Sequence, residues 1–359
     1  MKIGIIGVNH PHAGGHLQAL EGAPEIERLL IWDDDEASAR KAVENSAKAE
    51  LAGSAEEIVG AGDVPAVCIF VRDNEAGPRN LEAIRAGQWV SGDKPGAQTA
   101  PELGAIVQAA RETGAHFCPC YANRTMPMAR EIAWTLQDGA VGKLWAFNCQ
   151  WITSQVTCRG ADSWLFHKEY SAGGILTWLG CHWIDLLRMI FACEVTEVTA
   201  MVATQTEEAV DVEDTASVVL KFGNGAIGTV RAGYGLRVMG GYDNSDFHFQ
   251  FEGSEGALTW YPKGTPAGYR LRTINPRYSP FGVSRDIVVE AEAGRDARAP
   301  NGERRAGYAG GFLAEFLAAV RGEGELPATE VDAWQVLRVI EAAYEASATG
   351  TRVVVAERP

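Results

Sequence analysis

The first third of the chain alternates short apolar runs with longer segments in which apolar residues recur every three or four positions. The short runs are typical of buried strands, and the longer segments are typical of helices that cover a sheet. The predicted strands are residues 2–7, 29–32, 67–71, 89–90 and 116–120. The predicted helices cover or begin within residues 16–20, 37–48, 54–59, 80–86 and 101–113. This alternation predicts a doubly wound parallel sheet of the α/β class.

Beyond residue 122 the pattern changes to alternating apolar and polar positions, interrupted by a few helical segments. The predicted strands are residues 144–153, 195–204, 215–222, 226–232, 247–252 and 257–261. The predicted helices are residues 126–136, 184–191, 311–321 and 331–349. The segment 263–308 is rich in proline, glycine and arginine without a clear period, and we predict long surface loops there. We therefore expect two domains, residues 1–122 and 123–359, the second of the α+β type with an open, mainly antiparallel sheet.

Charge and cysteine content narrow the class of protein. The 359 residues carry a formal net charge of −15, which disfavours nucleic acid and anionic membranes as partners. No apolar segment approaches the length of a membrane span, and the apolar start reads as a first strand rather than a signal peptide. Seven scattered cysteines without a Cys-x-x-Cys pair indicate free thiols. We expect a cytoplasmic protein.

The loop after the first strand lies where a Rossmann domain binds the pyrophosphate of a dinucleotide. Gly7 begins it, but Asn9 and His12 occupy the positions of the second and third glycines of G-x-G-x-x-G. Asp33 ends the second strand and is a natural acceptor for an adenosine ribose hydroxyl, which favours NAD over NADP. We therefore predict that residues 1–122 form a Rossmann domain and bind the cofactor through Gly7, Asn9, His10, His12 and Asp33.

Three histidines of this loop, His10, His12 and His16, are spaced closely enough to suggest a metal site as an alternative. No carboxylate or thiolate lies beside them in the sequence. A histidine-rich loop can also contact phosphate directly, and we expect no metal.

Lys94 follows the fourth predicted strand, with Asp93 before it as an electrostatic partner and Pro95 after it. A lysine at the carboxyl edge of a parallel sheet faces the ligand crevice of such folds. Far along the chain, His182 and Asp185 share one face of a predicted helix, downstream of the pair Gly173-Gly174. A lysine and a histidine near a nicotinamide ring can relay the proton that accompanies hydride transfer, although a plain His–Asp pair in the core is equally consistent with this spacing.

Further residues are candidates for substrate contact. Arg124 lies at the predicted domain crossing, as a structural contact or as an anchor for cofactor or substrate. An aromatic and polar set fits a sugar-binding wall, although tryptophans at this density are also common in a core. Its members are Trp151, Arg159, Trp164, His167 and Trp178.

Several segments together resemble the Gfo/Idh/MocA oxidoreductases, the relatives of glucose–fructose oxidoreductase and inositol dehydrogenase. The segment from Gly87 to Pro95 is similar to the family's A-G-K-H-V-x-x-E-K-P signature, and Gly173 to Asp185 is similar to G-G-x-L-x-D-x-G-x-H-x-x-D. Shorter matches are Asn123-Arg124 with Pro127, the turn 139–143, and the turns 222–226 and 253–257. The resemblance covers nearly the whole chain.

The resemblance implies NAD(P)-dependent oxidation or reduction of a sugar, cyclitol or related polyol, with catalytic residues Lys94 and His182. The chain departs from the family pattern at four places. Asp93 replaces a glutamate, Trp178 replaces the acidic residue four positions before the histidine, the glycine loop is altered, and the third strand exits without T-P-x-x-x-H. These departures indicate a divergent branch.

We thus expect a dehydrogenase that acts on CH–OH groups, with NAD as cofactor and NADP possible. His182 would act as general base, with Lys94 on the same oxygen or in the reverse role. Arg124, Trp164, His167, Trp178 and Asp185 would contact the substrate. The open sheet suggests a homodimer or homotetramer. Two alternatives stay open: a sugar-modifying enzyme that oxidises its substrate only transiently, and a non-catalytic sensor of cofactor or sugar.

Overall fold

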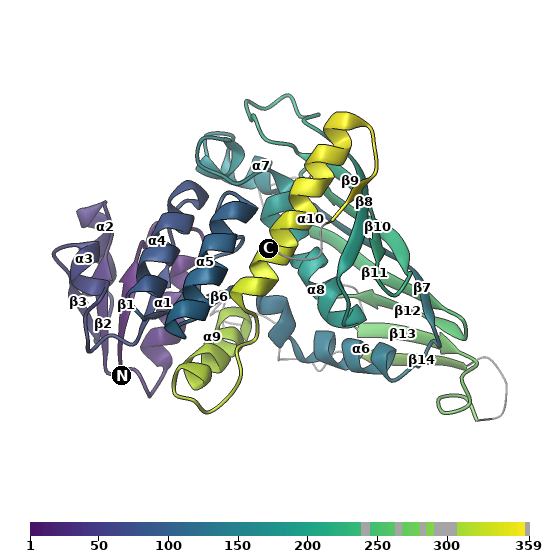
Figure 1. The fold of residues 1–359 in the computed structure, drawn as a ribbon, viewed down its shortest axis with the longest axis horizontal. Coiled ribbons are helices and arrows are strands. Elements are labelled where there is room, and N and C mark those ends of the chain that lie inside the picture. Colours follow the sequence, from purple (N-terminus) through teal and green to yellow (C-terminus); the bar gives the residue numbers. More distant parts are fainter. Residues whose placement is uncertain (238–244, 263–267, 281–284, 291–306, 356–359) are drawn as a thin grey trace. The chain divides into compact units, whose positions relative to one another are not determined.

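The computed structural model describes residues 1–237, 245–262, 268–280, 285–290 and 307–355 (Figure 1). The chain forms two compact units. The first contains Met1–Met126 and, later in the chain, the described residues 307–335. The second contains the described residues of Pro127–Ala293 and Val336–Pro359. This division differs from the expected 1–122 and 123–359, because helix α9 (Gly307–Val320) returns to the first unit.

The physical reason lies in the apolar side chains of α9. Phe312, Leu313, Phe316 and Leu317 are buried in one hydrophobic cluster with side chains of the first strands and of helix α1 (Ala13–Gly22). Burial of a large apolar side chain contributes about 1.5–3 kcal/mol, so four such residues bind α9 firmly to this unit. The distance along the chain has little influence on where a helix of this kind packs.

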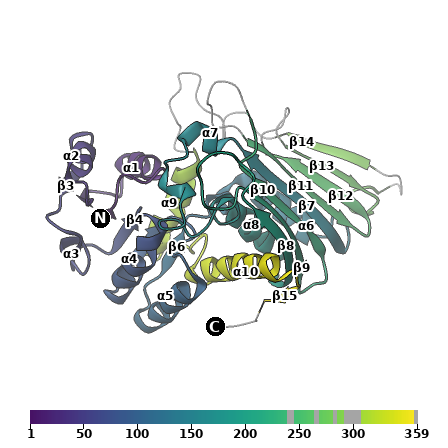
Figure 2. The same ribbon diagram turned by 90° about the horizontal axis from the view of Figure 1, so that it is seen from above.

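The first unit is built on a six-stranded parallel sheet in the order β3-β2-β1-β4-β5-β6. Its strands are β1 (Lys2–Ile6), β2 (Arg28–Trp32), β3 (Ala49–Leu51), β4 (Ala66–Ile69), β5 (Trp89–Gly92) and β6 (Phe117–Pro119). The other helices of this sheet are α2 (Glu36–Glu44), α3 (Ala55–Ile58), α4 (Asp73–Arg85) and α5 (Ala100–Thr113). Helices α4 and α5 lie on one face, and α1 and α9 on the other (Figure 2). The predicted parallel α/β sheet is confirmed.

Local sequence explains several boundaries in this unit. Thr99 accepts from the backbone N–H of Glu102, whose side chain accepts from the Thr99 N–H, so α5 starts with a complete capping box. Gly114 ends it with φ of 76°. Helix α4 begins seven residues earlier than the predicted 80–86, and it continues through Pro78, which lies past its first turn, where proline is best tolerated.

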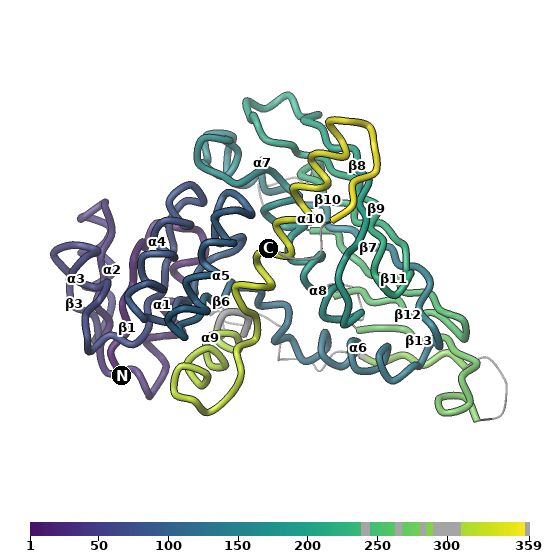
Figure 3. The backbone as a smooth tube through the Cα atoms, in the orientation of Figure 1, coloured from purple at the N-terminus to yellow at the C-terminus, as the bar shows by residue number. Residues whose placement is uncertain are grey.

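The second unit contains a nine-stranded sheet in the order β14-β13-β12-β11-β7-β10-β9-β8-β15. Its strands are β7 (Leu144–Thr153), β8 (Val195–Ala203), β9 (Thr215–Phe222), β10 (Ile227–Gly233), β11 (Ser245–Gly253), β12 (Gly256–Tyr261), β13 (Gly268–Thr273), β14 (Arg285–Glu290) and β15 (Val353–Val354). All neighbours are antiparallel except β7 and β10. The backbone path shows this open sheet (Figure 3). The predicted open, mainly antiparallel sheet is confirmed.

The prediction of surface loops over 263–308 is wrong for two stretches. β14 is an edge strand of the large sheet, and β13 lies between β14 and β12. In β13 the side chains of Tyr269, Leu271 and Thr273 are buried while Arg270 and Arg272 are exposed, which is the alternation of a half-buried strand. The arginines led to the prediction of a surface loop, although they occupy only the exposed positions of the strand. Residues 263–267, 281–284 and 291–306 of that segment lie outside the described part of the chain.

Helix α8 (Cys181–Phe191) packs on one face of the large sheet together with α6 (Pro127–Gln137) (Figure 1). Trp183 of α8 stacks on Trp151 of β7 with ring centroids 4.4 Å apart, and Phe191 lies 4.6 Å from Phe222 of β9. The remaining helical elements of the unit are α7 (Gln155–Arg159), the 3-10 turn η2 (Trp164–Phe166), the π-helical turn η3 (Leu176–Gly180) and most of α10 (Glu330–Thr349). No described helix is both long and apolar enough to cross a bilayer.

Candidate functional site

In the loop between β1 and α1, the packing of the chain requires glycine at position 7. Gly7 has φ of +89°, and a Cβ at this position would lie 2.1 Å from the carbonyl oxygen of Phe70. At Gly14 and Gly15 an added Cβ would meet no described atom within 4 Å, so the packing of the chain does not require glycine there. The open space beside these two residues fits a ligand that approaches the backbone closely.

Asp33 anchors this loop to the end of β2. Its carboxylate accepts hydrogen bonds from the Val8 N–H at 2.6 Å, the Asp35 N–H at 2.9 Å and the Asn9 side chain at 3.3 Å. Only 6% of Asp33 is exposed, and burial raises its pKa. The structure thus brings the predicted cofactor residues Gly7, Asn9 and Asp33 together.

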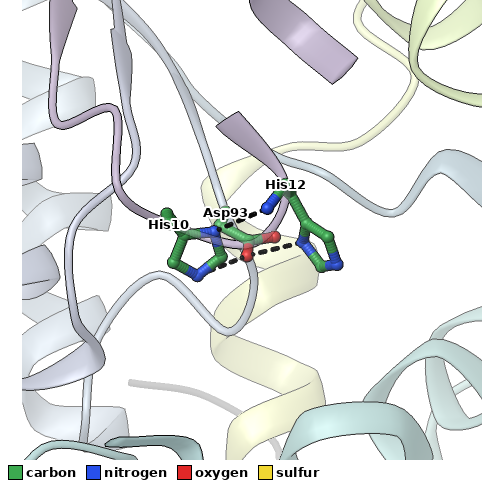
Figure 4. A group of neighbouring side chains, drawn as sticks. All are labelled: His10, His12 and Asp93. Carbon is green, nitrogen blue, oxygen red and sulfur yellow. Dashed lines mark hydrogen bonds and ion pairs between the residues drawn. The ribbon is translucent and has the colours of Figure 1, made fainter. Parts of the chain in front are cut away.

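A histidine–aspartate–histidine cluster joins the cofactor loop to the end of β5 (Figure 4). Nδ1 of His12 lies 2.8 Å from Oδ2 of Asp93, and Nε2 of His10 lies 3.0 Å from the same oxygen. The other oxygen of Asp93 accepts the backbone N–H of Lys94 at 2.9 Å. Burial alone would raise the pKa of Asp93, but the neighbouring His12 and His10 outweigh this effect and hold the pKa well below its usual range.

This cluster corrects one premise of the sequence analysis, because a carboxylate from a distant segment does lie beside the loop histidines. The three side chains offer ligand atoms within 4.8 Å of one another, a set that can hold a metal ion. The hydrogen bonds favour protons instead. Nδ1 of His10 accepts from the His12 backbone N–H at 3.3 Å, which places the proton of His10 on Nε2, where a metal would have to bind.

His16 lies in α1 and contacts a thiol. Its Nε2 is 3.4 Å from Sγ of Cys120, and only 2% of the residue is exposed. Burial lowers the pKa of His16 to about 4, so the ring is neutral at pH 7. Burial also raises the pKa of the Cys120 thiol well above its usual value. This pair is a core contact, and every described cysteine is free.

Lys94 directly follows Asp93 and is fully buried, with 0% of its surface exposed. It lies just beyond the carboxyl end of β5, where parallel sheets bind their ligands. Lysine is almost never fully buried unless its ammonium group is paired. The position of Lys94 is therefore typical of a functional lysine rather than of a surface one.

His182 stands at the start of α8, directly after the π-helical turn η3. Turns of this kind occur mostly as single turns and often at functional sites. His182 is buried, with 5% of its surface exposed, and its ring lies 5.9 Å from that of Trp151. Asp185, one turn later, is fully buried and lies 3.7 Å from Nη1 of Arg188.

The backbone before His182 is held by two residues that the sequence analysis did not identify, Glu213 and Tyr344. The Glu213 carboxylate accepts hydrogen bonds from the N–H groups of Gly174 at 2.8 Å and Leu176 at 3.0 Å. A Cβ at Gly174 would lie 1.9 Å from the Glu213 carbonyl oxygen, which explains the glycine. No local signal in the sequence pointed to Glu213.

The aromatic candidates gather near η3. The indole N–H of Trp178 donates to the side-chain oxygen of Gln155 at 2.9 Å, and the Trp164 ring meets Trp178 edge-on at 6.3 Å. His167 lies 3.0 Å from the carbonyl oxygen of Ala161. Trp178 is 2% exposed, so its indole fills the interior of this unit.

Arg124 belongs to the first unit and has partners within it. Nη2 donates to Oδ1 of Asp332 at 2.9 Å, and Nη1 donates to the carbonyl oxygen of Pro327 at 3.3 Å. Through these contacts Arg124 connects the turn η1 (Ala122–Thr125) to a segment about two hundred positions later in the chain, which is a structural role. They favour the structural alternative over a role as anchor for a ligand.

Two family models match the chain. One, described as an oxidoreductase family with an NAD-binding Rossmann fold, matches residues 1–120. The other, described as the GFO/IDH/MocA C-terminal domain, matches residues 129–259. Together they cover more than two thirds of the sequence. The first match confirms the Rossmann domain and NAD as the cofactor.

Named relatives are similar over most of their length. The chain is 25% identical to the 1,5-anhydro-D-fructose reductase of Ensifer adhaerens over 300 residues, which are 83% of this chain and 81% of that protein. It is 26% identical to inositol 2-dehydrogenase 2 of Saccharopolyspora erythraea over 272 residues, 74% of each. A levoglucosan dehydrogenase solved in complex with NADH shares the fold, with a TM-score of 0.85, 20% identity and 99% of both chains covered.

Proposed function

Because the chain belongs to the Gfo/Idh/MocA family of oxidoreductases, we propose that it transfers a hydride between NAD and a hydroxyl or carbonyl group of a sugar, cyclitol or related polyol. The names of its relatives support this substrate class, since they contain an anhydro sugar, inositol and levoglucosan. The observation that carries the proposal is the fully buried Lys94 beyond the carboxyl end of a parallel strand.

The residues that would hold the cofactor are those of the loop that begins at Gly7, together with Asp33 at the end of β2. NAD, when bound, supplies the hydride acceptor. The space beside Gly14 and Gly15 and the short bonds that fix Val8 to Asp33 fit a dinucleotide that lies over this loop.

The proton chemistry is assigned to two side chains. When an alcohol is oxidised, it loses a hydride to the cofactor and a proton to a base. We assign the base to His182, whose buried ring stands in the first turn of α8. We assign to Lys94 a hydrogen bond to the alcohol oxygen, which stabilises the negative charge that develops there.

The test is formation of NADH, followed by absorbance, with a panel of anhydro sugars, inositols and hexoses. Lys94→Met keeps the length of the side chain and removes its charge, and we expect turnover to fall about a hundredfold or more. Lys143→Met, at an exposed lysine in a turn, is the matched control. A Lys94→Met enzyme with normal turnover would exclude this role, and analysis of the carbohydrate products would reveal transient oxidation without net NADH.

A further inference from the structure

The cofactor loop lacks two of the glycines that usually bring backbone N–H groups close to a dinucleotide pyrophosphate. Asn9 takes the place of one, and its side chain donates to Asp33, where it supports the loop. His12 takes the place of the other and stands at the N-cap of α1, but its side chain makes no capping hydrogen bond to that helix. The side chain of His12 therefore does not cap its own helix.

His12 is instead bound to the buried Asp93. Its Nδ1 lies 2.8 Å from Oδ2, so this nitrogen carries the proton and donates it to the carboxylate. The ring is 36% exposed while the carboxylate is 8% exposed.

The neighbouring His10 is not placed to contact a ligand. Its Nδ1 accepts the His12 backbone N–H, and its Nε2 lies 3.0 Å from Asp93. Its side chain is 1% exposed. Of the two histidines on Asp93, His12 is therefore the one that can reach a ligand.

The orientation of the His12 ring follows from the Asp93 contact. Nδ1 faces Asp93, and Nε2 lies on the side of the ring that is turned away from this carboxylate (Figure 4). The N-terminus of a helix is the positive end of the helix dipole and favours an anion. Helix N-termini accordingly bind phosphate groups readily.

We propose that His12, held by Asp93, donates from Nε2 to a phosphate oxygen of the dinucleotide and so replaces the missing glycine contact. This inference rests on the proposed function, because it concerns the same cofactor. It changes the expected consequence of the altered loop: the substitution of glycine by histidine strengthens binding of the diphosphate rather than weakening it. Asp93 acts as a positioning residue, since it orients His12 without touching the cofactor.

The experiment is calorimetric titration of the full chain with NAD, with ADP-ribose and with adenosine, each with and without EDTA. Only NAD and ADP-ribose contain the diphosphate. His12→Gly restores the usual glycine, and we expect it to weaken NAD and ADP-ribose about tenfold or more, the loss of one charge-assisted hydrogen bond. The affinity for adenosine should stay unchanged. Asp93→Asn should weaken the same two ligands to a smaller extent.

The matched control is His116→Asn, which changes a histidine that pairs with Glu330 in the same unit. Thermal melting of each variant shows whether it folds. Unchanged or tighter NAD binding by a folded His12→Gly variant would overturn the inference and leave the oxidoreductase proposal intact. Binding of ADP-ribose that depends on His12, in a protein that oxidises no polyol, would support the inference and count against the proposed function. Binding that EDTA abolishes would overturn the direct contact in favour of a metal ion.

Discussion

The Tyr344 hydroxyl donates a hydrogen bond of 2.8 Å to the Glu213 carboxylate, although 131 positions separate the two residues. The same hydroxyl lies 2.7 Å from the Thr177 hydroxyl in η3. Glu213 in turn accepts the N–H groups of Gly174 and Leu176. One short network thus determines the position of the backbone that leads into His182.

Tyr344→Phe removes one donor from Glu213 and one partner from Thr177. We expect the free energy of unfolding, measured in urea, to fall by about 1–2 kcal/mol. We also expect turnover to fall while the affinity for NAD stays the same, because the change affects the His182 segment and not the cofactor loop. Tyr261→Phe, at a half-exposed tyrosine, is the control. Equal effects of both changes would contradict the role of this network.

His16 predicts a specific loss of stability in acid. Its pKa is about 4 in the folded protein and 6.5 in the unfolded chain. Between these values the unfolded chain binds a proton that the folded protein does not bind, so stability is lost as the pH falls from about 7 towards 4. The contribution of His16 at pH 4.5 is about 2–3 kcal/mol.

This dependence is measured by comparison of the wild type with His16→Gln, whose side chain does not titrate. Unfolding free energies at pH 7 and at pH 4.5 should show a smaller acid loss for the variant. The comparison removes the contribution of all other titrating groups. An identical loss in both proteins would refute the assignment of a neutral buried His16.

His182→Asn tests the proposed general base. The asparagine amide is smaller than the imidazole ring and accepts no proton at neutral pH, so we expect turnover to fall about a hundredfold or more. The dissociation constant of NAD, measured by calorimetry, should change less than about twofold, because His182 belongs to the second unit. His248→Asn, on β11 of the same unit, serves as control. Normal turnover in His182→Asn would assign the base elsewhere.

Asp33 predicts a preference for NAD over NADP. A carboxylate at the end of the second strand accepts ribose hydroxyls and repels a 2′-phosphate, and like charges placed together cost several kcal/mol. We expect NADP to bind at least about tenfold more weakly than NAD, and Asp33→Asn to narrow the difference. Asp34→Asn, at the exposed neighbour, should leave it unchanged. Equal affinities in the wild type would show that Asp33 only anchors the loop.

The face of the large sheet opposite α8 predicts self-association. Met201 on β8 and Ile227 on β10 are 81% and 49% exposed, and Val219 on β9 is 37% exposed beside them. An exposed group of apolar side chains on a sheet is typical of a protein interface. Sedimentation should show an oligomer, and Met201→Glu with Ile227→Glu should dissociate it. Trp134→Glu, on α6, is the control, and a monomeric wild type would contradict the prediction.

Local sequence was sufficient for most strands of both units. The predicted segments 144–153 and 215–222 coincide with β7 and β9, because a strand with one buried face must alternate and the next residues contain turn signals. β13 shows where this fails: its exposed positions are arginines in a stretch with many glycines and prolines, and composition outweighed the alternation of Tyr269, Leu271 and Thr273. β3, with three residues, is too short to produce a period.

The candidate site could be predicted only as far as its motifs extend. Lys94 and His182 stand in segments whose local pattern identifies them. The residues that support the site cannot be identified in this way. The hydrogen bond between Asp93 and His12, for example, joins positions 81 residues apart, and neither segment alone shows a pattern that predicts it. For the same reason Asp93 is predicted from the sequence only as an electrostatic partner of Lys94, and not as the carboxylate beside the loop histidines.

By itself, the sequence determined the class of fold and the cofactor, and it supplied the two residues proposed for proton transfer. The fold class follows from the alternation of segments along the chain, and the cofactor and the two residues follow from motifs within single segments. Only the tertiary structure decided that α9 belongs to the first unit, that Arg124 is bound by Asp332, and that Glu213 and Tyr344 hold the approach to His182. These contacts arise when distant segments are buried against each other. Burial then requires that every polar group in the contact finds a partner, wherever along the chain that partner lies.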